Sequence, residues 1–324
     1  MLDSHGRKID YLRISITDRC NLRCQYCMPE ELPSINHTEI LRFEEILEIC
    51  RQAVALGITK FKVTGGEPLV RKGCLPFLRS LKNLPGVEQV TITTNGILLK
   101  DCLSELEDIG IDGINISLDT LNPENYEKMT GRNEFSRVWD AILAAQASKI
   151  HTKINCVLLK GMNDQEFFDL IHLAKDYSLD VRFIEIMPIG FGKGFEGFDK
   201  KDLLAQLAEK YPDYQSIQNP RGNGPASYVS IPGFKGCIGF IDAIHGKFCD
   251  QCNRIRLTSD GILKLCLYYE NGINLKNLLR SGASSEKLLD IMKHTIYKKP
   301  AEHQFHLIAK EGSEELKKMS QIGG

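Results

Sequence analysis

The sequence predicts an α/β protein, an incomplete (β/α)6 barrel of the TIM type whose open side is closed by a C-terminal α+β region. Two observations favour this class. Over the first two-thirds of the chain, short runs rich in β-branched and aromatic residues alternate with longer amphipathic runs, which is typical of a parallel sheet covered by helices. About six such units occupy roughly 190 residues, whereas a barrel of eight units usually needs about 250.

The expected strands are apolar runs, most of which end in a turn signal. They span residues 11–17, 60–64, 88–94, 112–119, 152–159 and 180–187. The expected helices between them repeat apolar side chains at three- and four-residue spacing. They span residues 38–57, 101–109, 134–149 and 164–178. Because the strands of such a sheet are parallel, functional residues are expected near their carboxyl ends.

After residue 190 the pattern changes, so we divide the chain into a partial barrel, residues 1–190, and a C-terminal region, residues 191–324. A Gly- and Phe-rich link leads to a helix near 199–210 and to short strands joined by turns. These strands are expected at residues 227–231, 236–241, 253–258 and 262–267, and amphipathic segments follow near 274–281 and 285–298. The last two strands form a hairpin with Asp260-Gly261 at its tip.

Composition excludes several classes of protein. The formal net charge of the 324 residues is −1, which argues against a broad basic surface and therefore against a nucleic-acid partner. No run approaches the roughly 18 apolar residues of a membrane span, and the opening residues lack the apolar core of a secretory signal. Eleven cysteines, an odd number, argue against a disulfide framework. We therefore expect a cytoplasmic protein that binds no membrane.

The first cysteine group follows the first expected strand. Cys20, Cys24 and Cys27 have the spacing C-x3-C-x2-C. A structural zinc site needs four ligands, and the nearest histidine, His37, lies ten residues further on. A [4Fe–4S] cluster normally takes four cysteines. Three cysteines would leave one iron open to a substrate or cofactor.

The second cysteine group lies near the predicted hairpin. Cys249, Cys252 and Cys266 have the spacing C-x2-C-x13-C, and pairing of the two arms would bring the last two together. A structural zinc site with His245 as fourth ligand is one interpretation. Arg254 and Arg256 favour another, because alternate residues of a strand share a face. Two guanidiniums beside the metal suit a polyphosphate.

The cysteine loop resembles the signature of radical S-adenosylmethionine enzymes, and TGGEP at residues 64–68 resembles their second motif. Over nearly the whole chain, motifs such as TTNG, NISLDT, IEIMPIG, FCDQCNRIRLTSDG and the terminal MSQIGG resemble the GTP 3′,8-cyclases of molybdenum cofactor biosynthesis. The resemblance implies S-adenosylmethionine and two three-cysteine [4Fe–4S] clusters. It also implies a lyase that converts GTP to (8S)-3′,8-cyclo-7,8-dihydroguanosine 5′-triphosphate. In that family a 5′-deoxyadenosyl radical removes the ribose 3′ hydrogen, and C3′ then attacks C8 of guanine.

The resemblance also assigns roles to individual residues. It implies that S-adenosylmethionine is held by Tyr26, Gly66, Ser117 and Met187. It implies that GTP is held by Arg13, Lys62, Thr93, Lys153, Arg254 and Arg256. Thr94 is an alternative to Thr93, and Lys62 is left open between phosphate and base. Arg254, Arg256 and the double-glycine tail, Gly323 and Gly324, are expected to be needed for activity.

The resemblance further implies three partners. The product would pass to cyclic pyranopterin monophosphate synthase, a flavodoxin or ferredoxin would donate electrons, and a homodimer is expected because members of the family are often dimers. Two other hypotheses stay open. One is a different radical S-adenosylmethionine enzyme whose second cluster is fully ligated, with Cys237 as a candidate fourth thiolate. The other is a non-catalytic binding module in which both cysteine groups hold zinc.

Overall fold

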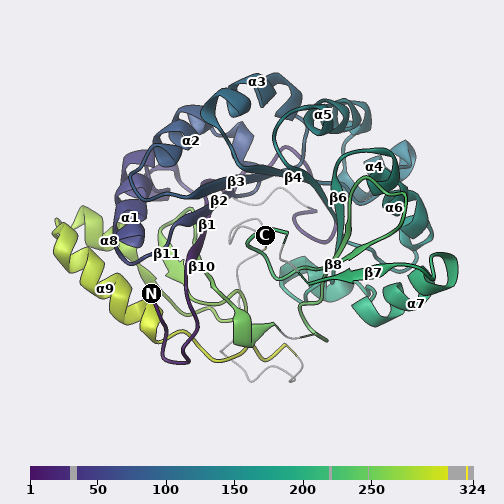
Figure 1. Ribbon diagram of the computed structural model, residues 1–324. Helices are drawn as coiled ribbons and strands as arrows, with labels where there is room; N and C mark the ends of the chain where they lie inside the picture. The colour runs from purple at the N-terminus through teal and green to yellow at the C-terminus, as the bar shows by residue number, and fades with distance from the viewer. Residues whose placement is uncertain (30–34, 219–220, 247, 306–318, 320–324) are drawn as a thin grey trace.

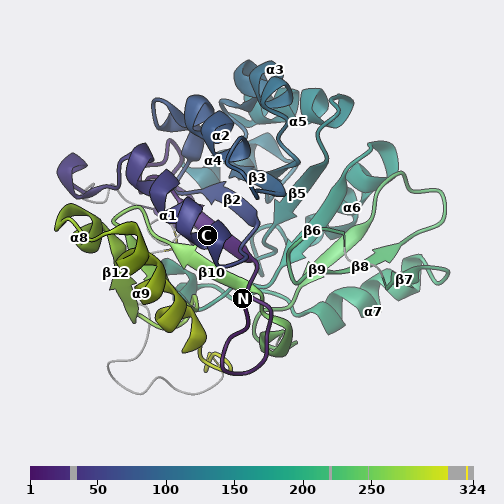
Figure 2. The ribbon, with the colours of Figure 1, turned by 60° about the vertical axis from the view of Figure 1, so that its left-hand side comes forward.

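The computed structural model describes residues 1–29, 35–218, 221–246, 248–305 and 319. Within these residues the strands form one mixed sheet in the order β12-β11-β10-β1-β2-β3-β4-β5-β6-β9-β8-β7. The sheet curves, and helices cover its outer side (Figures 1 and 2). Alternating strands and helices confirm the expected α/β class. Because the two ends of the order, β12 and β7, are edges, the sheet is open, which is consistent with an incomplete barrel.

The strands and helices have the following bounds. The strands are Tyr11–Ser15 (β1), Lys60–Thr64 (β2), Gln89–Thr94 (β3), Gly113–Ser117 (β4), Thr152–Cys156 (β5), Asp180–Ile184 (β6), Gln215–Ile217 (β7), Ser227–Ser230 (β8), Ile238–Ile241 (β9), Arg254–Leu257 (β10), Ile262–Lys264 (β11) and Gly272–Asn274 (β12). The helices are Phe43–Ala55 (α1), Cys74–Lys82 (α2), Leu99–Ile109 (α3), Pro123–Thr130 (α4), Phe135–Ala147 (α5), Phe167–Asp176 (α6), Lys200–Lys210 (α7), Leu275–Arg280 (α8) and Ser285–Tyr297 (α9).

The six parallel strands β1 to β6 lie where the sequence predicts them. Two short helices, α2 and α4, and two short strands, β7 and β12, were not predicted. Helix α4 has little apolar periodicity, and it starts at a local cap instead. The side chain of Asn122 accepts hydrogen bonds from the backbone of Glu124 and Asn125, and Pro123 stands in the first turn, where its missing N–H costs nothing.

The prediction that short turns join all the C-terminal strands is wrong for one pair. Strands β9 and β10 are consecutive in the chain, but β9 pairs with β6 and β10 pairs with β1, both in parallel. They therefore lie at opposite edges of the six-stranded centre and are not joined by a short turn. The hairpin of β10 and β11 is confirmed, with Arg256 opposite Lys264. The C-terminal region thus extends both edges of the sheet.

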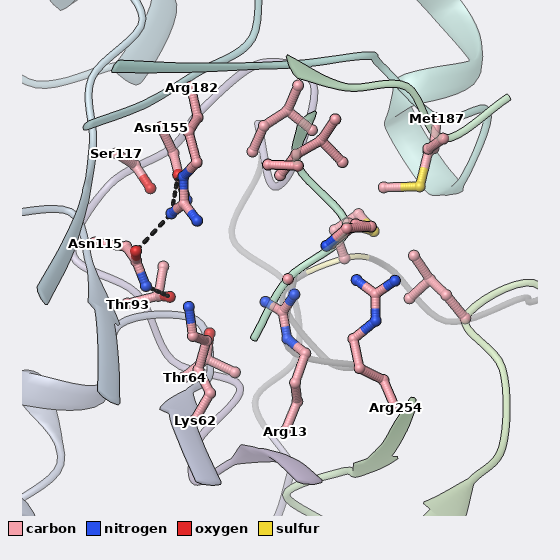
Figure 3. Close-up of a pocket in the computed structure, with 18 of the residues that line it drawn as sticks. Arg13, Lys62, Thr64, Thr93, Asn115, Ser117, Asn155, Arg182, Met187 and Arg254 are labelled. Atoms are coloured by element: carbon pink, nitrogen blue, oxygen red, sulfur yellow. Dashed lines mark hydrogen bonds between the residues drawn. The ribbon is translucent and has the colours of Figure 1, made fainter. Parts of the chain in front are cut away.

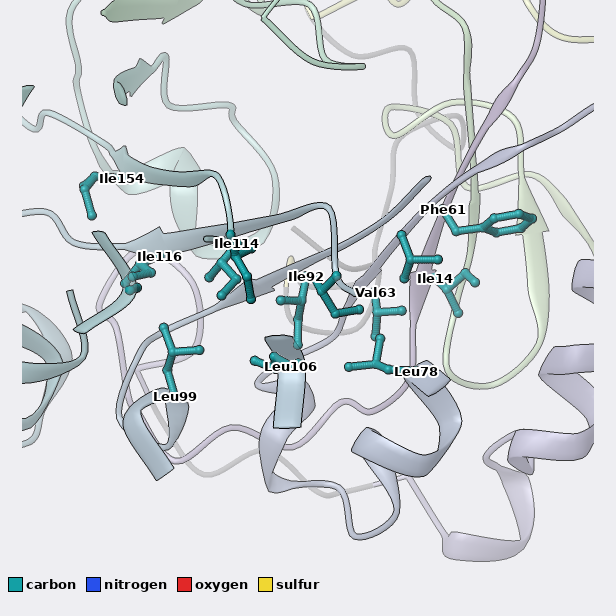
Figure 4. Close-up of a cluster of buried hydrophobic side chains, with 14 of the residues drawn as sticks. Ile14, Phe61, Val63, Leu78, Ile92, Leu99, Leu106, Ile114, Ile116 and Ile154 are labelled. Atoms are coloured by element: carbon teal, nitrogen blue, oxygen red, sulfur yellow. The ribbon is translucent and has the colours of Figure 1, made fainter. Parts of the chain in front are cut away.

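The two faces of the sheet differ in chemistry. Alternate residues of the central strands point inward and are mostly polar or charged (Figure 3). The others point outward and pack against the helices in a continuous core (Figure 4); they include Ile14, Val63, Ile92, Ile116 and Ile154, all fully buried. Burying each such side chain contributes about 1.5–3 kcal/mol. The outer face therefore stabilises the fold, while the inner face is free to carry function.

In the part of the chain that the structure describes, no helix is both long and apolar enough to cross a membrane.

Candidate active site

A cavity of about 690 Å³ opens on the inner face of the sheet. Both cysteine groups line it, and so does every described residue that the sequence assigns to S-adenosylmethionine or GTP. Gly323 and Gly324 lie outside the described residues. Met319, four residues before Gly323, does line the cavity. The strand arrangement therefore gathers residues from nearly the whole chain at one site.

The two cysteine groups enter this cavity from opposite ends of neighbouring strands. Cys20 follows the carboxyl end of β1, whereas Cys252 precedes the amino end of β10, which pairs in parallel with β1. Cys266 follows β11, which is antiparallel to β10, so it lies at the same end as Cys252. Four or five residues at about 3.3 Å each separate the two ends, which is about 15 Å. A small molecule can lie between the groups.

Local backbone contacts shape the first cysteine loop. The backbone N–H groups of Cys27 and Met28 both donate to the carbonyl of Cys24, at 3.0 and 2.8 Å, and the N–H of Leu22 donates to Cys20 Sγ at 3.4 Å. Burial raises the pKa of Cys24 well above its ordinary value, and the neighbouring Cys27 adds to this shift. The three cysteines therefore lie on one short, partly buried loop.

The backbone leading to the first cysteine loop leaves no room for a side chain at the two glycines of TGGEP. A Cβ on Gly66 would lie 2.3 Å from the carbonyl oxygen of Arg19, and one on Gly65 would lie 2.5 Å from that of Thr17. Neither glycine has a positive φ, so the reason is close approach of two backbones and not turn geometry. The motif thus packs directly against the residues that lead to Cys20.

Glu67 of the same motif joins the first loop to the TTNG segment. Its carboxylate accepts hydrogen bonds from Asn95 N at 2.6 Å, Leu69 N at 3.0 Å and Thr94 Oγ1 at 2.8 Å. Burial raises the pKa of Glu67 to about 7 against these donors. The hydroxyl of Thr94 is therefore committed to the scaffold. Thr93 instead lies on the inner face, 3.4 Å from Asn115 Nδ2, which favours it over Thr94 as a contact for a ligand.

Positive side chains surround the second cysteine group. Although burial alone would raise the pKa of Cys252, the ammonium of Lys299 and the guanidinium of Arg254 lower it to about 7. Arg254 also stacks over the ring of Phe248, with Cζ 4.6 Å from the centroid. Burial raises the pKa of Cys249. The Cys252 thiolate is thus favoured by its surroundings before any metal binds.

The spacing of the sulfur atoms tests whether the cysteines fit a single zinc ion or an iron–sulfur cluster. Two thiolates on one tetrahedral zinc, each at about 2.3 Å, lie about 3.8 Å apart. Among the described residues, the group of three or more potential ligands within 4.8 Å of one another is Glu185, Asp242 and His245, and it contains no cysteine. Neither cysteine set is as compact as a zinc site, which fits thiolates that bind different irons of a cluster.

The two alternative fourth ligands have other partners in the structure. His245 pairs with Glu185 through its Nδ1. The backbone N–H of Cys237 donates to Asp180 Oδ1 at 3.1 Å, next to β9, which lies on the opposite side of the six central strands from β10. The structure therefore does not support the zinc interpretation with His245, nor the fully ligated cluster with Cys237.

A row of cations crosses three neighbouring strands. Arg13 of β1 lies opposite Arg256 of β10 on one side and Lys62 of β2 on the other, at the spacing of about 4.8 Å between strands. Burial, together with the nearby guanidiniums, lowers the pKa of Lys62 and of Arg256 well below their ordinary values. Arg13, Lys62 and Arg254 point into the same space (Figure 3). Such a row calls for a multiply charged anion.

Arg182 is a further cation that sequence reasoning missed. It lies on β6, 7% exposed, and its Nη2 donates to Asn115 Oδ1 and Asn155 Oδ1, each at 2.5 Å (Figure 3). The available signal was polar residues in strands that are otherwise apolar, namely Asn115 in GINIS, Asn155 in TKINC and Arg182 in DVRFI. Their period-two placement puts all three on the inner face.

Lys153 lines the cavity but is also held by protein groups. Its ammonium donates to the Tyr228 hydroxyl at 3.0 Å and to the carbonyl of Arg221, and it lies 3.5 Å from Asp180 Oδ2. Burial and then Arg182 lower the pKa of Lys153 to about 8, although Asp180 opposes this shift. Lys62 differs, because its ammonium makes no hydrogen bond or ion pair within the described chain. Lys62 is therefore the freer cation.

The residues assigned to S-adenosylmethionine line the cavity beside the first loop. The hydroxyl of Tyr26 donates to Asp119 Oδ2 at 2.7 Å, and Asp119 Oδ1 accepts from Val157 N at 2.8 Å. Ser117 lies at the carboxyl end of β4, and Met187 follows β6 (Figure 3). The aromatic ring of Tyr26 is thus oriented by a buried carboxylate that sequence reasoning did not single out.

Comparison with known proteins now identifies the family. The description "Radical SAM superfamily" matches residues 14–174, and "Molybdenum Cofactor Synthesis C" matches residues 179–305. The GTP 3′,8-cyclase of Clostridium perfringens is 43% identical over 325 residues, and that of Heliobacterium modesticaldum is 44% identical over 329; both alignments cover 100% of each chain. The chain belongs to the GTP 3′,8-cyclase family. The resemblance noted in the sequence is confirmed.

Solved structures support the fold of this GTP 3′,8-cyclase family member. Streptococcus suis SuiB matches with a TM-score of 0.65, 15% identity, and coverage of 92% of this chain and 68% of that one. SuiB bound to S-adenosylmethionine matches with a TM-score of 0.63, 15% identity, and coverage of 88% and 68%. At this identity the likeness concerns the fold alone.

Proposed function

We propose that this protein is a GTP 3′,8-cyclase, a radical S-adenosylmethionine lyase that forms (8S)-3′,8-cyclo-7,8-dihydroguanosine 5′-triphosphate in molybdenum cofactor biosynthesis. One observation carries the proposal. Two three-cysteine groups open into the same cavity from opposite strand ends, and a row of cations lies between them. When bound, the clusters and S-adenosylmethionine supply the radical that removes the ribose 3′ hydrogen so that C3′ can attack C8 of guanine.

The cysteines divide the cavity into two halves. Cys20, Cys24 and Cys27 would hold the first [4Fe–4S] cluster, and Tyr26, Gly66, Ser117 and Met187 would hold S-adenosylmethionine beside it. Cys249, Cys252 and Cys266 would hold the second cluster. Each set offers three thiolates, so each leaves one iron for a ligand other than protein. Cofactor and substrate would thereby share one cavity.

The cations orient the substrate between these halves. Arg13, Lys62, Arg254 and Arg256 would neutralise the triphosphate, and Arg182 adds a buried positive charge on the opposite wall. Guanidiniums fork onto phosphate oxygens with several donors and so restrict its orientation. Thr93 and Lys153 would complete the contacts to GTP. Held this way, the substrate would lie between the two cysteine groups.

The finer assignments belong to the same proposal. The product would pass to cyclic pyranopterin monophosphate synthase, and a flavodoxin or ferredoxin would supply electrons. We also propose a cytoplasmic homodimer, a division into residues 1–190 and 191–324, and a role in activity for the tail glycines, Gly323 and Gly324. The cavity-lining Met319 supports the last point.

The test is cluster content combined with nucleotide-dependent turnover. After anaerobic reconstitution we expect about eight irons per chain with matching sulfide. With S-adenosylmethionine and dithionite, 5′-deoxyadenosine should form much faster when GTP is present than when it is absent. About four irons plus zinc would make the second group structural and overturn the proposal, as would turnover that is indifferent to GTP.

A further inference from the structure

Arg7 lies in the N-terminal segment and has no role in the proposed function. Its guanidinium binds the main chain at the second cysteine group. Its Nη1 donates to the carbonyl of Cys249 at 2.9 Å and to that of Ala301 at 2.7 Å. Its Nη2 donates to the carbonyls of Pro300 at 2.6 Å and Lys299 at 3.3 Å. Arg7 is 7% exposed, and its Nε pairs with Asp3 at 2.7 Å. One buried side chain thus joins the N-terminal segment, Cys249 and residues 299–301.

Lys299 connects the other two cysteines. It follows α9, is 2% exposed, and its ammonium donates to the carbonyl of Arg254 at 2.9 Å and to the carbonyl of Leu265. Arg254 lies two residues after Cys252, and Leu265 directly precedes Cys266. The ammonium therefore bridges the two hairpin arms at the point where each arm carries a cysteine.

We propose that Arg7 and Lys299 form a clamp that positions all three cysteines of the second cluster and supplies positive charge beside it. Arg7 holds the main chain of Cys249, and Lys299 holds the main chain beside Cys252 and Cys266. The two cations are linked to each other, because Arg7 also binds the carbonyl of Lys299. The inference rests on the proposed function only in taking these cysteines as cluster ligands. Arg7 and Lys299 are positioning residues, since neither is expected to touch GTP.

The charge of Lys299 gives the clamp a second effect. Within the described residues Lys299 forms no ion pair with a carboxylate. A buried ammonium without a counter-charge is costly, and anionic thiolates and cluster would supply that charge. Net charge near a cluster sets its reduction potential. A positive charge favours the more negative, reduced cluster, so Lys299 raises the potential of the second cluster relative to a neutral side chain.

The experiment compares matched pairs of variants in the anaerobically reconstituted protein. Lys299→Met removes the charge at similar length, Lys299→Arg keeps it, and Lys298→Met changes the exposed neighbour. Arg7→Met removes the grip on Cys249, with Lys8→Met as its exposed control. Each protein is measured for iron and sulfide per chain and for the midpoint potential of each cluster.

We expect the two control variants to keep about eight irons. Arg7→Met and Lys299→Met should fall toward about four irons while the first cluster keeps its spectrum and potential, which also shows that the barrel is folded. Any second cluster that Lys299→Met retains should have a more negative midpoint potential, and Lys299→Arg should restore it. If Arg7→Met and Lys299→Met both keep full iron content and unchanged midpoint potentials, the clamp is overturned but the proposed second cluster is not. A wild-type chain with only about four irons would overturn the proposed second cluster, and the clamp with it.

Discussion

The two cysteine groups bind the same kind of cofactor in the proposed function but are built differently. Cys20, Cys24 and Cys27 lie on one loop, shaped by backbone contacts among near neighbours. Cys252 and Cys266 are brought together by the β10–β11 hairpin, and Cys249 is held by Arg7, 242 residues away. The first group is therefore a local structure, whereas the second depends on the assembled fold.

The two cysteine groups also differ in their electrostatic surroundings, which are acidic at Cys24 and cationic at Cys252. Burial raises the pKa of Cys24, and nearby acidic groups such as Asp119 add to the shift. At Cys252 burial acts in the same direction, but Lys299 and Arg254 outweigh it and lower the pKa to about 7. The second group lies within the cations that would bind the triphosphate. An anionic substrate and an anionic cluster can therefore share one set of positive charges.

The strongest test of this comparison replaces one cysteine in each group. Cys266→Ser should abolish cyclisation of GTP but leave measurable cleavage of S-adenosylmethionine, because the first group is intact. Cys24→Ser should abolish both reactions. Product and 5′-deoxyadenosine are quantified in the same anaerobic assay. Cys50→Ser, at a buried cysteine of α1 that does not line the cavity, serves as control. Intact cyclisation in Cys266→Ser would contradict the role of the second group.

The second test removes the arginines that accompany the second group. Arg254→Ala together with Arg256→Ala should weaken GTP binding by about a hundredfold or more, since each charge-assisted hydrogen bond contributes about 1.5–3 kcal/mol. Guanosine, which lacks phosphates, should lose much less. Equilibrium binding of both ligands to the reconstituted protein measures the difference. Equal losses for the two ligands would remove these arginines from the phosphate site.

A third test perturbs only the first group. Gly66→Ala places a Cβ 2.3 Å from the Arg19 carbonyl, so the cysteine loop must shift. We expect a loss of roughly 1–3 kcal/mol in the free energy of unfolding and weaker binding of S-adenosylmethionine. Chemical denaturation and equilibrium binding measure the two effects. Gly194→Ala is the matched control, because a Cβ there meets nothing within 4 Å. Identical behaviour of the two variants would show that the close approach has no consequence.

The smallest expected effect concerns Lys153, at the opposite side of the sheet from the second group. Its pKa of about 8 means that it loses its charge as pH rises from 7 to 9. GTP affinity should therefore fall by up to about tenfold over this range. Lys153→Arg keeps the charge and should flatten this part of the profile, since arginine stays protonated. Parallel profiles for the two proteins would show that Lys153 does not contribute a titrating contact.

Much of the site was predictable because its residues carry their signal in short patterns. The spacing of Cys20, Cys24 and Cys27, and the alternation of Arg254 and Arg256, required no knowledge of distant contacts. The six parallel strands followed from β-branched runs bounded by turns. Helix α4 was missed because its start depends on a polar cap and not on apolar periodicity.

Arg7 and Lys299 could not be found in this way, and for Arg182 the alternation along its strand indicated only which face it lies on. Each is a single charged residue, and most single charged residues are solvated. Their burial arises only when segments far apart in the chain meet, as when Arg182 reaches Asn115, 67 residues away, or when Lys299 reaches the hairpin.

The sequence alone therefore determined the class of fold, the two cysteine groups and the family, because strand periodicity, cysteine spacing and short motifs are local properties. Only the tertiary structure decided that β10 joins the edge of β1, which puts Arg256, Arg13 and Lys62 in one row and both cysteine groups in one cavity. The physical reason is that pairing of distant strands is selected by the burial of the whole core. No short segment contains that information.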